Sequence, residues 1–190
     1  MLNTTFTNIT TELAVVAKHL RRSTVKVRNG SSGGGSGVIW RRDGLIITNA
    51  HVATHRRVTV ELWDGQLFTA VRVSIDPTKD LAALKIAASN LPAATIGNSD
   101  AVRVGELVLA VGNPFGDNGA VTSGIIYTNH LRMVTADIRL FPGNSGGPLA
   151  DCMGRVIGIN TMIVHGLAVA IPSLAVESFL QGHYHVTEAL

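Results

Sequence analysis

Three residues, His51, Asp80 and Ser145, lie in segments whose composition suits acyl-transfer chemistry. Ser145 stands in the run Phe141–Leu149, where glycines allow a tight bend and a close approach to a substrate. A serine hydroxyl is a weak nucleophile, so this chemistry requires a histidine as base and a carboxylate that fixes the histidine tautomer. The N–H groups of Gly143 and Ser145 could then donate to the oxyanion that forms at the attacked carbonyl. By itself the run also fits an ordinary turn.

The candidate base and carboxylate each follow or precede an apolar stretch of the sequence. His51 comes shortly after Leu45–Ile47, and Asp80 comes directly before Leu81–Ile86. A single histidine in this setting is more commonly a surface or hydrogen-bonded core residue, and a single aspartate is more commonly a cap or turn residue. The three residues therefore indicate catalysis only as a combination.

The elements that must position these residues are short apolar stretches separated by turn signals, which are typical of β-strands. The first series of predicted strands comprises Ser23–Arg28, Gly37–Trp40, Leu45–Asn49, Val58–Leu62, Leu67–Ile75 and Leu81–Ile86. The second series comprises Glu106–Val111, Ala120–Tyr127, Met133–Ile138, Gly147–Leu149, Arg155–Asn160 and Leu167–Ile171. The Pro- and Gly-containing stretch Ser89–Asp100 joins the two series. Many short strands with almost no interior helix predict an all-β sandwich or barrel.

Two helices are expected at the ends of the chain. Apolar residues recur at helical spacing in Glu12–Arg22, and Thr10 and Thr11 provide a cap. Near the other end, we expect a closing helix over Leu174–Leu180 that ends at Gly182.

Composition excludes several classes of protein. The chain has 190 residues, of which 46% are apolar and only 15% are charged, so a globular protein with a large core is expected. Its apolar runs are far shorter than the ~18 residues of a membrane-spanning helix. The single cysteine, Cys152, excludes an internal disulfide and a multi-cysteine zinc site. The pair His183 and His185 is expected to be solvated, and neither a metal nor a cofactor is predicted.

The charge and the N-terminus bear on partners and location. The net charge is +3 and aromatic residues are 5% of the chain, which disfavours a nucleic-acid partner. The glycine-rich segment Gly30–Gly37 is predicted to be a flexible connection, since a phosphate loop would have to open a helix. No signal peptide is visible, so the default location is cytoplasmic, or periplasmic or exported if a leader was removed.

An α/β-hydrolase is a competing enzyme class, because Gly143–Gly147 has the G-x-S-x-G pattern. That motif must run into a helix, with the acid and the histidine following the serine. Here Pro148 and a predicted strand follow, and strands do not alternate with helices. The context therefore rejects this class.

In combination, the motifs resemble the trypsin-like serine proteases, and specifically their HtrA/Deg branch. The segments that carry the resemblance are Thr48–Val52, Asp76–Ala82 and Gly143–Leu149, in the order of the family. Further likeness runs through Gly37–Trp40, Val111–Gly116, Val121–Ile125, Gly154–Asn160 and Ala170–Ser173, and the resemblance covers about Ser23 to Phe179. It implies an all-β fold of two perpendicular antiparallel β-barrels with an N-terminal and a C-terminal helix, and an active site between the barrels.

The resemblance also implies roles for individual residues. Ser145 is expected to be the nucleophile, His51 the general base and then acid, Asp80 the orienting carboxylate, and the N–H groups of Gly143 and Ser145 the oxyanion hole. Leu140 is expected to line the specificity pocket. The pocket would face the strand residues Gly166, Leu167, Ala168 and Val169. An apolar pocket favours an aliphatic side chain before the scissile bond, because a buried Lys or Arg would lack a carboxylate partner.

The implied function is a serine endopeptidase that cleaves unfolded or misfolded polypeptides through an acyl-enzyme. The alternative is a catalytically silent protease fold that binds peptides. Asn144 stands where digestive trypsins carry an aspartate, which disfavours zymogen activation. Arg139 and Phe141 replace residues that are usually small or polar in this family beside the oxyanion turn. Predicted strands and the closing helix occupy the residues after Ser145, so no PDZ domain is expected within this sequence.

The expected organisation follows from the resemblance together with the two strand series. Residues 1–22 form an N-terminal helical segment, 23–90 the first β-barrel, 91–182 the second β-barrel with the closing helix, and 183–190 a tail. The N-terminal helix is expected either to pack on its own barrel or to contribute to a homotrimer.

Overall fold

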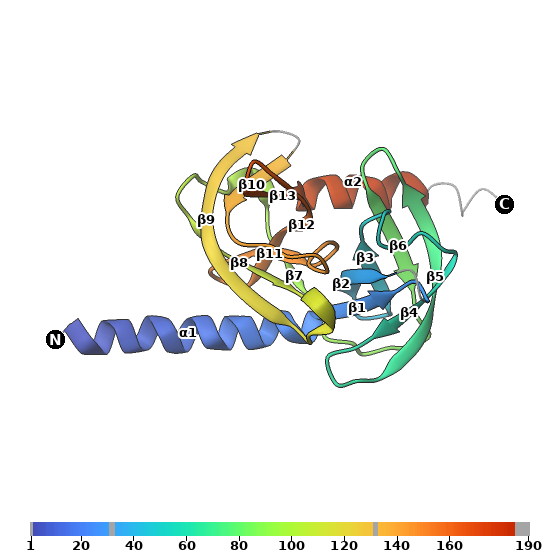
Figure 1. Ribbon diagram of the computed structural model, residues 1–190, viewed down its shortest axis with the longest axis horizontal. Coiled ribbons are helices and arrows are strands. Elements are labelled where there is room, and N and C mark those ends of the chain that lie inside the picture. Colours follow the sequence, from blue (N-terminus) through green and yellow to red (C-terminus); the bar gives the residue numbers. More distant parts are fainter. Residues whose placement is uncertain (1, 31–32, 131–132, 185–190) are drawn as a thin grey trace.

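The computed structural model describes residues 2–30, 33–130 and 133–184 of the chain, and within them it contains two β-barrels (Figure 1). The first is a closed antiparallel barrel with the strand order β1-β2-β3-β6-β5-β4. Its strands are β1 (Thr24–Arg28), β2 (Gly34–Arg41), β3 (Leu45–Thr48), β4 (Arg57–Glu61), β5 (Leu67–Asp76) and β6 (Leu81–Lys85). The first predicted strand series thus forms one barrel.

The second predicted strand series forms a sheet in the order β11-β8-β9-β10-β13-β12-β7, which closes on itself because β11 also pairs with β12. Its strands are β7 (Thr95–Ile96), β8 (Leu107–Gly112), β9 (Ala120–His130), β10 (Met133–Asp137), β11 (Pro148–Asp151), β12 (Arg155–Val164) and β13 (Leu167–Pro172). The short β7, which the sequence pattern did not predict, adds to β12 as a parallel edge strand. Short 3-10 turns occupy Ser99–Ala101 and Pro114–Gly116. The predicted pair of antiparallel barrels is confirmed.

Strand pairing in the first barrel brings the predicted base and carboxylate together. Every residue of β3 is buried, and so are the first four of β6. The two strands pair antiparallel, with Thr48 opposite Ala82. His51 follows β3 and Asp80 precedes β6, so both lie at the same end of this barrel.

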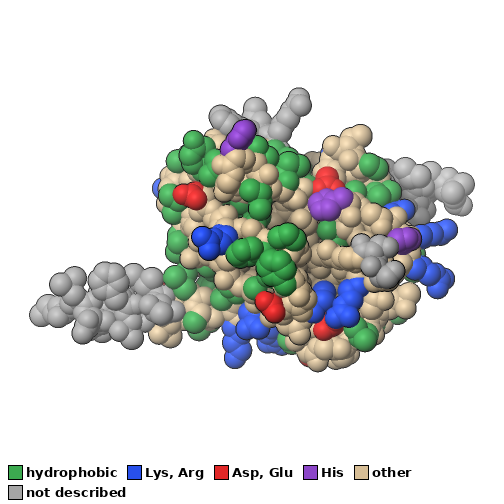
Figure 2. Space-filling model, in the orientation of Figure 1, with side chains coloured by type: hydrophobic (Ala, Val, Ile, Leu, Met, Phe, Trp, Pro, Cys, Tyr) green, Lys and Arg blue, Asp and Glu red, His purple; other side chains and the backbone are tan. Residues whose placement is uncertain are grey.

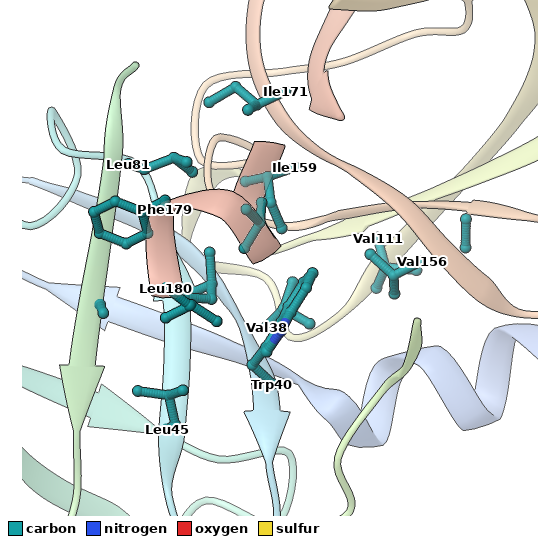
Figure 3. Packing of buried hydrophobic residues seen from close by; sticks show 14 of the residues in the cluster. Val38, Trp40, Leu45, Leu81, Val111, Val156, Ile159, Ile171, Phe179 and Leu180 are labelled. Carbon is teal, nitrogen blue, oxygen red and sulfur yellow. The ribbon is translucent and has the colours of Figure 1, made fainter. Parts of the chain in front are cut away.

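A shared hydrophobic core holds the two barrels and the C-terminal helix together (Figure 3). Leu45 and Leu81 come from the first barrel and Ile159 from the second, while Phe179 and Leu180 come from α2 (Ser173–Tyr184). Burial of each large apolar side chain contributes about 1.5–3 kcal/mol. This core therefore holds the loops of one barrel against those of the other.

The helices differ from their predicted bounds. α1 spans Leu2–Ser23 and so begins ten residues before Glu12, although the Thr/Asn-rich start has low helix propensity. Its last turns pack on the protein, where Leu20 is 2% exposed, whereas its first turns extend away from the barrels (Figure 1). α2 continues past Gly182 to Tyr184, so this glycine does not end the helix. The tail from residue 185 onward lies outside the described residues.

The glycine-rich segment was predicted to be a flexible connection, and this is wrong for its second half. Gly34–Gly37 belong to β2 and pair with β1, while residues 31 and 32 lie outside the described part. A Cβ on Gly35 would lie 2.7 Å from the carbonyl oxygen of Ser145. The glycines therefore let the loop that carries Ser145 pack directly on a strand of the first barrel.

None of the described helices combines the length and the apolar character that crossing a lipid bilayer requires.

Candidate active site

His51 and Asp80 form a close pair at the end of the first barrel. The Nδ1 atom of His51 lies 2.8 Å from Oδ2 of Asp80 and 3.0 Å from Oδ1. The backbone N–H of His51 donates to the same carboxylate over 3.1 Å. These contacts fix the ring so that Nδ1 faces the carboxylate and Nε2 faces away from it. This is the orientation that a histidine needs to act as a base at Nε2.

The pair shifts the pKa of both residues. The hydrogen bond that His51 donates to Asp80 raises the pKa of His51 above its usual value, and it outweighs the opposing effect of partial burial. Burial alone would raise the pKa of Asp80, but hydrogen bonds from His51 and from the Thr161 hydroxyl outweigh burial and lower it. Asp80 is therefore ionised at neutral pH and stabilises a proton on His51.

The backbone around Asp80 adopts an unusual conformation that serves this pairing. Asp80 has a φ of +53°, in the left-handed region that few residues other than glycine occupy. Its carbonyl oxygen accepts hydrogen bonds from the backbone N–H of Ala50 at 3.2 Å and from the side-chain amide of Asn49 at 3.0 Å. The segment before β6 is thus fastened to the segment that carries His51.

Ser145 lies in a tight loop of the second barrel. The N–H of Asn144 donates to the carbonyl of Phe141 at 3.0 Å, and the N–H of Gly147 donates to the carbonyl of Asn144 at 3.0 Å. Gly143 has a φ of +105°, and a Cβ there would lie 2.6 Å from the carbonyl oxygen of Asn113. Within the described ranges, the N–H groups of Gly143 and Ser145 donate to no protein acceptor. Two donors that flank Asn144 are thus available to a ligand, as an oxyanion hole requires.

Thr161, at the middle of β12, connects the serine to the aspartate. Its hydroxyl donates to Oδ2 of Asp80 at 2.6 Å, and its carbonyl oxygen accepts a hydrogen bond from the hydroxyl of Ser145 at 3.2 Å. Among the described residues, no hydrogen bond joins Ser145 to His51. The structure therefore brings all three predicted triad residues around Thr161, with the serine hydroxyl turned toward the Thr161 carbonyl.

Ser36 of β2 supports the same loop from the first barrel. This side chain is fully buried, and its hydroxyl donates to the carbonyl of Gly143 at 2.7 Å. The hydroxyl also accepts from the backbone N–H and the side-chain amide of Asn113, at 2.9 and 3.0 Å. In addition, the Ser36 N–H donates to the Ser145 carbonyl at 2.8 Å. One serine thus links the two barrels directly behind the predicted oxyanion hole.

A small cavity of about 170 Å³ opens beside Ser145. Its lining comprises Leu140, Phe141, Pro142, Asn144, Ser145, Thr161, Met162 and Ile163. Leu140 thus lines a cavity beside Ser145, and its role in a specificity pocket stays a prediction. Gly166, Leu167, Ala168 and Val169 are outside this lining; the last three belong to β13, which pairs with the β12 residues that do line it.

An aromatic pair separates this cavity from a larger cleft. Phe141 lines the small cavity and contacts Phe115, with ring centroids 5.8 Å apart. Phe115 is 78% exposed and has a φ of +53°, which is unusual for a bulky residue. The larger cleft, of about 610 Å³, is lined by Phe115 together with Pro142 and Gly143. Two recesses therefore adjoin the loop around Ser145, one on either side of Pro142.

Sequence reasoning missed Ser36, Thr161 and Phe115 as parts of this site. Ser36 stood in a segment that the glycine content marked as a connection, and Thr161 was placed just beyond a predicted strand. Neither residue carries a local pattern that indicates its long-range hydrogen bonds.

In the described part of the chain, no three His, Cys, Asp or Glu side chains converge in a way that could hold a metal ion.

Known proteins share this fold and these motifs. Residues 35–159 match the family described as a trypsin-like peptidase domain. A protein of Chlamydia muridarum, described as a probable periplasmic serine endoprotease DegP-like, is 44% identical over 156 residues, covering 74% of this chain and 31% of its own. The mitochondrial serine protease HTRA2 of Bos taurus is 41% identical over 161 residues, covering 77% of this chain and 35% of its own.

The solved structure of an HtrA-type protease, AlgW with a decapeptide, superposes with a TM-score of 0.82 and 32% identity, covering 91% of this chain and 67% of that one. The present chain spans about a third of the length of the two curated relatives. Their periplasmic and mitochondrial locations belong to those proteins, and the cytoplasmic location expected here stays a prediction. The motif order, the two barrels and the extent of these matches lead to one assignment: the chain belongs to the HtrA/DegP-type family of trypsin-like serine proteases.

Proposed function

We propose that this chain is a serine endopeptidase domain in which Ser145 is the nucleophile, His51 the general base and acid, and Asp80 the orienting carboxylate. The observation that carries the proposal is the contact of 2.8 Å between His51 Nδ1 and Asp80 Oδ2, with Thr161 connecting that carboxylate to Ser145. Membership of a protease family supports it independently.

The proposed reaction begins when the Ser145 hydroxyl turns from the Thr161 carbonyl to His51. Nε2 of His51 removes the hydroxyl proton while Oγ attacks the substrate carbonyl carbon. The free N–H groups of Gly143 and Ser145 donate to the resulting oxyanion. His51 then gives its proton to the leaving amine, and the carbon–nitrogen bond breaks to leave an acyl-enzyme.

Water completes the cycle by the same route. His51 takes a proton from water, whose oxygen attacks the ester, and returns that proton to Oγ of Ser145 as the carbon–oxygen bond breaks. Asp80 stabilises the imidazolium in both halves of the reaction, which fits the raised pKa of His51.

The substrate class follows from the recess beside Ser145. A cavity of about 170 Å³ with Leu140 and Ile163 in its wall suits a small or medium aliphatic side chain before the scissile bond. Its lining holds no carboxylate that could pair with a buried Lys or Arg. The substrate must also lie extended across the site, which folded chains resist. We therefore propose unfolded polypeptides as substrates, with cuts after Val, Ala, Ile or Leu.

Labelling with a fluorophosphonate probe tests the proposed nucleophile. The probe should modify Ser145 of the wild-type domain and leave Ser145→Ala unlabelled, as located by peptide mass spectrometry. Hydrolysis of a reduced, carboxymethylated protein should fall by on the order of 10⁶-fold in Ser145→Ala, to the level that binding and the oxyanion hole support. Full hydrolysis by Ser145→Ala would contradict the proposal.

A catalytically silent peptide-binding module is the second candidate. The observation that favours it is the hydrogen bond from the Ser145 hydroxyl to the Thr161 carbonyl, which holds the hydroxyl away from His51. The same labelling experiment separates the two candidates. A wild-type domain that binds unfolded peptides but neither reacts with the probe nor cleaves them would establish the silent module.

Two further expectations belong to this proposal. A homotrimer is proposed as the assembly, with α1 as a candidate contact element, and sedimentation of the purified domain tests it. We propose no nucleic-acid partner, and a fluorescence polarisation assay with single-stranded oligonucleotides checks this.

A further inference from the structure

A basic pocket lies where α1 meets the first barrel, away from the triad. Its volume is about 340 Å³. The charged side chains in its lining are Lys18, Arg21, Arg22, Lys26 and Glu61. The last turns of α1, β1 and β4 all contribute, so the pocket exists only because the helix packs on the barrel.

Several of these cations are held in place by uncharged groups. Arg21 donates to the carbonyl of Asn118 at 3.0 Å. The Arg22 guanidinium lies 5.5 Å from the centre of the Trp63 ring. The lysine on β1, Lys26, is only 8% exposed and donates to the carbonyl of Gly116 at 2.8 Å. A carbonyl or an aromatic ring orients a cation without cancelling its charge.

Glu61 is the one carboxylate in the lining, and it is already engaged. It pairs with Arg28, outside this pocket, and lies 3.9 Å from the Nζ atom of Lys26. Lys18, Arg21 and Arg22 form no ion pair with a described acidic residue. The pocket therefore carries a clear excess of positive charge at neutral pH.

The basic pocket adjoins the cleft of about 610 Å³ beside the catalytic loop. Lys26 and Asn113 line both recesses. That cleft also reaches Pro142 and Gly143 of the catalytic loop. Figure 2 shows several Lys and Arg side chains gathered on the lower part of the face in view. The cleft thus lies between the proposed oxyanion hole and the basic pocket.

An extended substrate that places the aliphatic side chain before the cut in the small cavity must continue past Ser145 with the segment that follows the cut. The larger cleft is lined by Gly143, Phe115 and Lys26, so it offers a course for this segment from the catalytic loop toward the pocket. We propose that the basic pocket binds acidic side chains of the substrate in the segment that follows the cut. This inference rests on the proposed function and adds a charge requirement, at a distance from the scissile bond, to the aliphatic preference.

Physical chemistry favours a peptide segment as the occupant. Exposed charges attract over a Debye length of about 8 Å at physiological ionic strength, so binding requires that the acidic residues reach the pocket itself. A nucleic acid would need aromatic faces for base stacking, whereas Arg22 already covers the Trp63 ring. The position next to the cleft beside the catalytic loop further favours a tethered substrate, since the bound cut site raises the effective concentration of the acidic segment.

A series of matched peptides tests the proposal. Each peptide carries the same aliphatic cut site, and a pair of aspartates is stepped one residue at a time along the segment that follows the cut, with asparagines as the neutral reference. We expect the acidic-to-neutral ratio of kcat/KM to rise about three- to tenfold at the positions that reach the pocket. That ratio should return to one in 0.5 M salt.

Charge-removing variants locate the effect. The double variant Lys18→Gln/Arg22→Gln should bring the acidic-to-neutral ratio of kcat/KM down to about one. The control Arg42→Gln/Arg103→Gln removes the same charge from positions outside both recesses and should keep the wild-type ratio. A ratio near one at every aspartate position in the wild-type domain would overturn the proposal, as would equal ratios in the two double variants. Inhibition by single-stranded DNA without any acidic preference would instead assign the pocket to nucleic acid.

The readout separates this inference from the proposed function. If no peptide is cleaved, the endopeptidase assignment fails and the pocket proposal falls with it. If the neutral peptides are cleaved and aspartates have no effect, only the pocket proposal fails.

Discussion

Replacement of Ser36 by alanine should damage catalysis although the Ser36 hydroxyl bonds to no triad residue and does not line the substrate cavity. The hydroxyl connects the Gly143 carbonyl with two donors of Asn113, at distances of 2.7 to 3.0 Å, in a fully buried environment. Ser36→Ala removes one donor and one acceptor, which leaves the Gly143 carbonyl and the Asn113 N–H without this partner, while the Asn113 side-chain amide keeps its hydrogen bond to the Val25 carbonyl. Each buried polar group left unpaired costs about 1–3 kcal/mol.

The expected loss of stability is about 2–4 kcal/mol, because partial relaxation around the methyl group offsets some of the cost. The effect on rate follows from the Gly143 peptide, whose N–H is a proposed oxyanion donor. Complete loss of one such donor costs on the order of 10²- to 10³-fold in kcat, so a donor that is displaced rather than removed should cost about 10- to 100-fold. KM should change little, because the substrate cavity keeps its walls.

Ser173→Ala is the matched control for this experiment. Ser173 is also fully buried, and its hydroxyl donates to the Gly97 carbonyl at 2.7 Å, away from the catalytic loop. This variant should lose about 1–2 kcal/mol of stability and keep its kcat. Urea unfolding measures stability, initial rates measure kcat and KM, and affinity for a peptidyl boronate reports on the oxyanion hole. Equal kcat values in the two variants would refute the reasoning.

The remaining predictions concern the triad, the specificity pocket and the N-terminal helix. Because neutral His51 is the base and its pKa is raised by its hydrogen bond to Asp80, kcat/KM should increase with pH through a midpoint above about 6.5. Asp80→Asn should move that midpoint to lower pH and reduce kcat on the order of 10⁴-fold, so an unchanged pH profile would exclude this pairing as the cause. Leu140→Asp should suppress cuts after aliphatic residues and favour cuts after Lys or Arg in a peptide library mapped by mass spectrometry, and an unaltered cut pattern would remove Leu140 from the pocket. Deletion of residues 1–22 should lower the melting temperature, because it removes the buried Leu20 from the core, and identical thermal unfolding and sedimentation after deletion would show that the helix covers nothing.

Several features of this protein were predictable from local sequence. Short apolar stretches between turn residues predicted most of the strands, because a strand that is buried on one or both faces is rich in apolar residues. The order of the segments around His51, Asp80 and Ser145 indicated the family before any geometry was known. Boundaries were less accurate: α1 begins ten residues earlier than its predicted start at Glu12, and Gly182 does not end α2. Helix ends depend on tertiary contacts that local propensity does not include.

Other features were decided only by the tertiary structure. Ser36 and Asn113 lie 77 positions apart in the sequence, and Asp80 and Thr161 lie 81 positions apart, yet each pair shares a hydrogen bond. No local pattern encodes such contacts, because they arise only when the shared core presses one barrel against the other. The same reason explains the basic pocket. Lys18 and Lys26 belong to separate elements, and in the sequence their charges are typical of ordinary solvated groups. They line one pocket only because α1 packs on the first barrel. The sequence by itself thus determined the strands, the family and the chemically active residue types, whereas the packing of the two barrels decided how those residues are oriented and which charges converge.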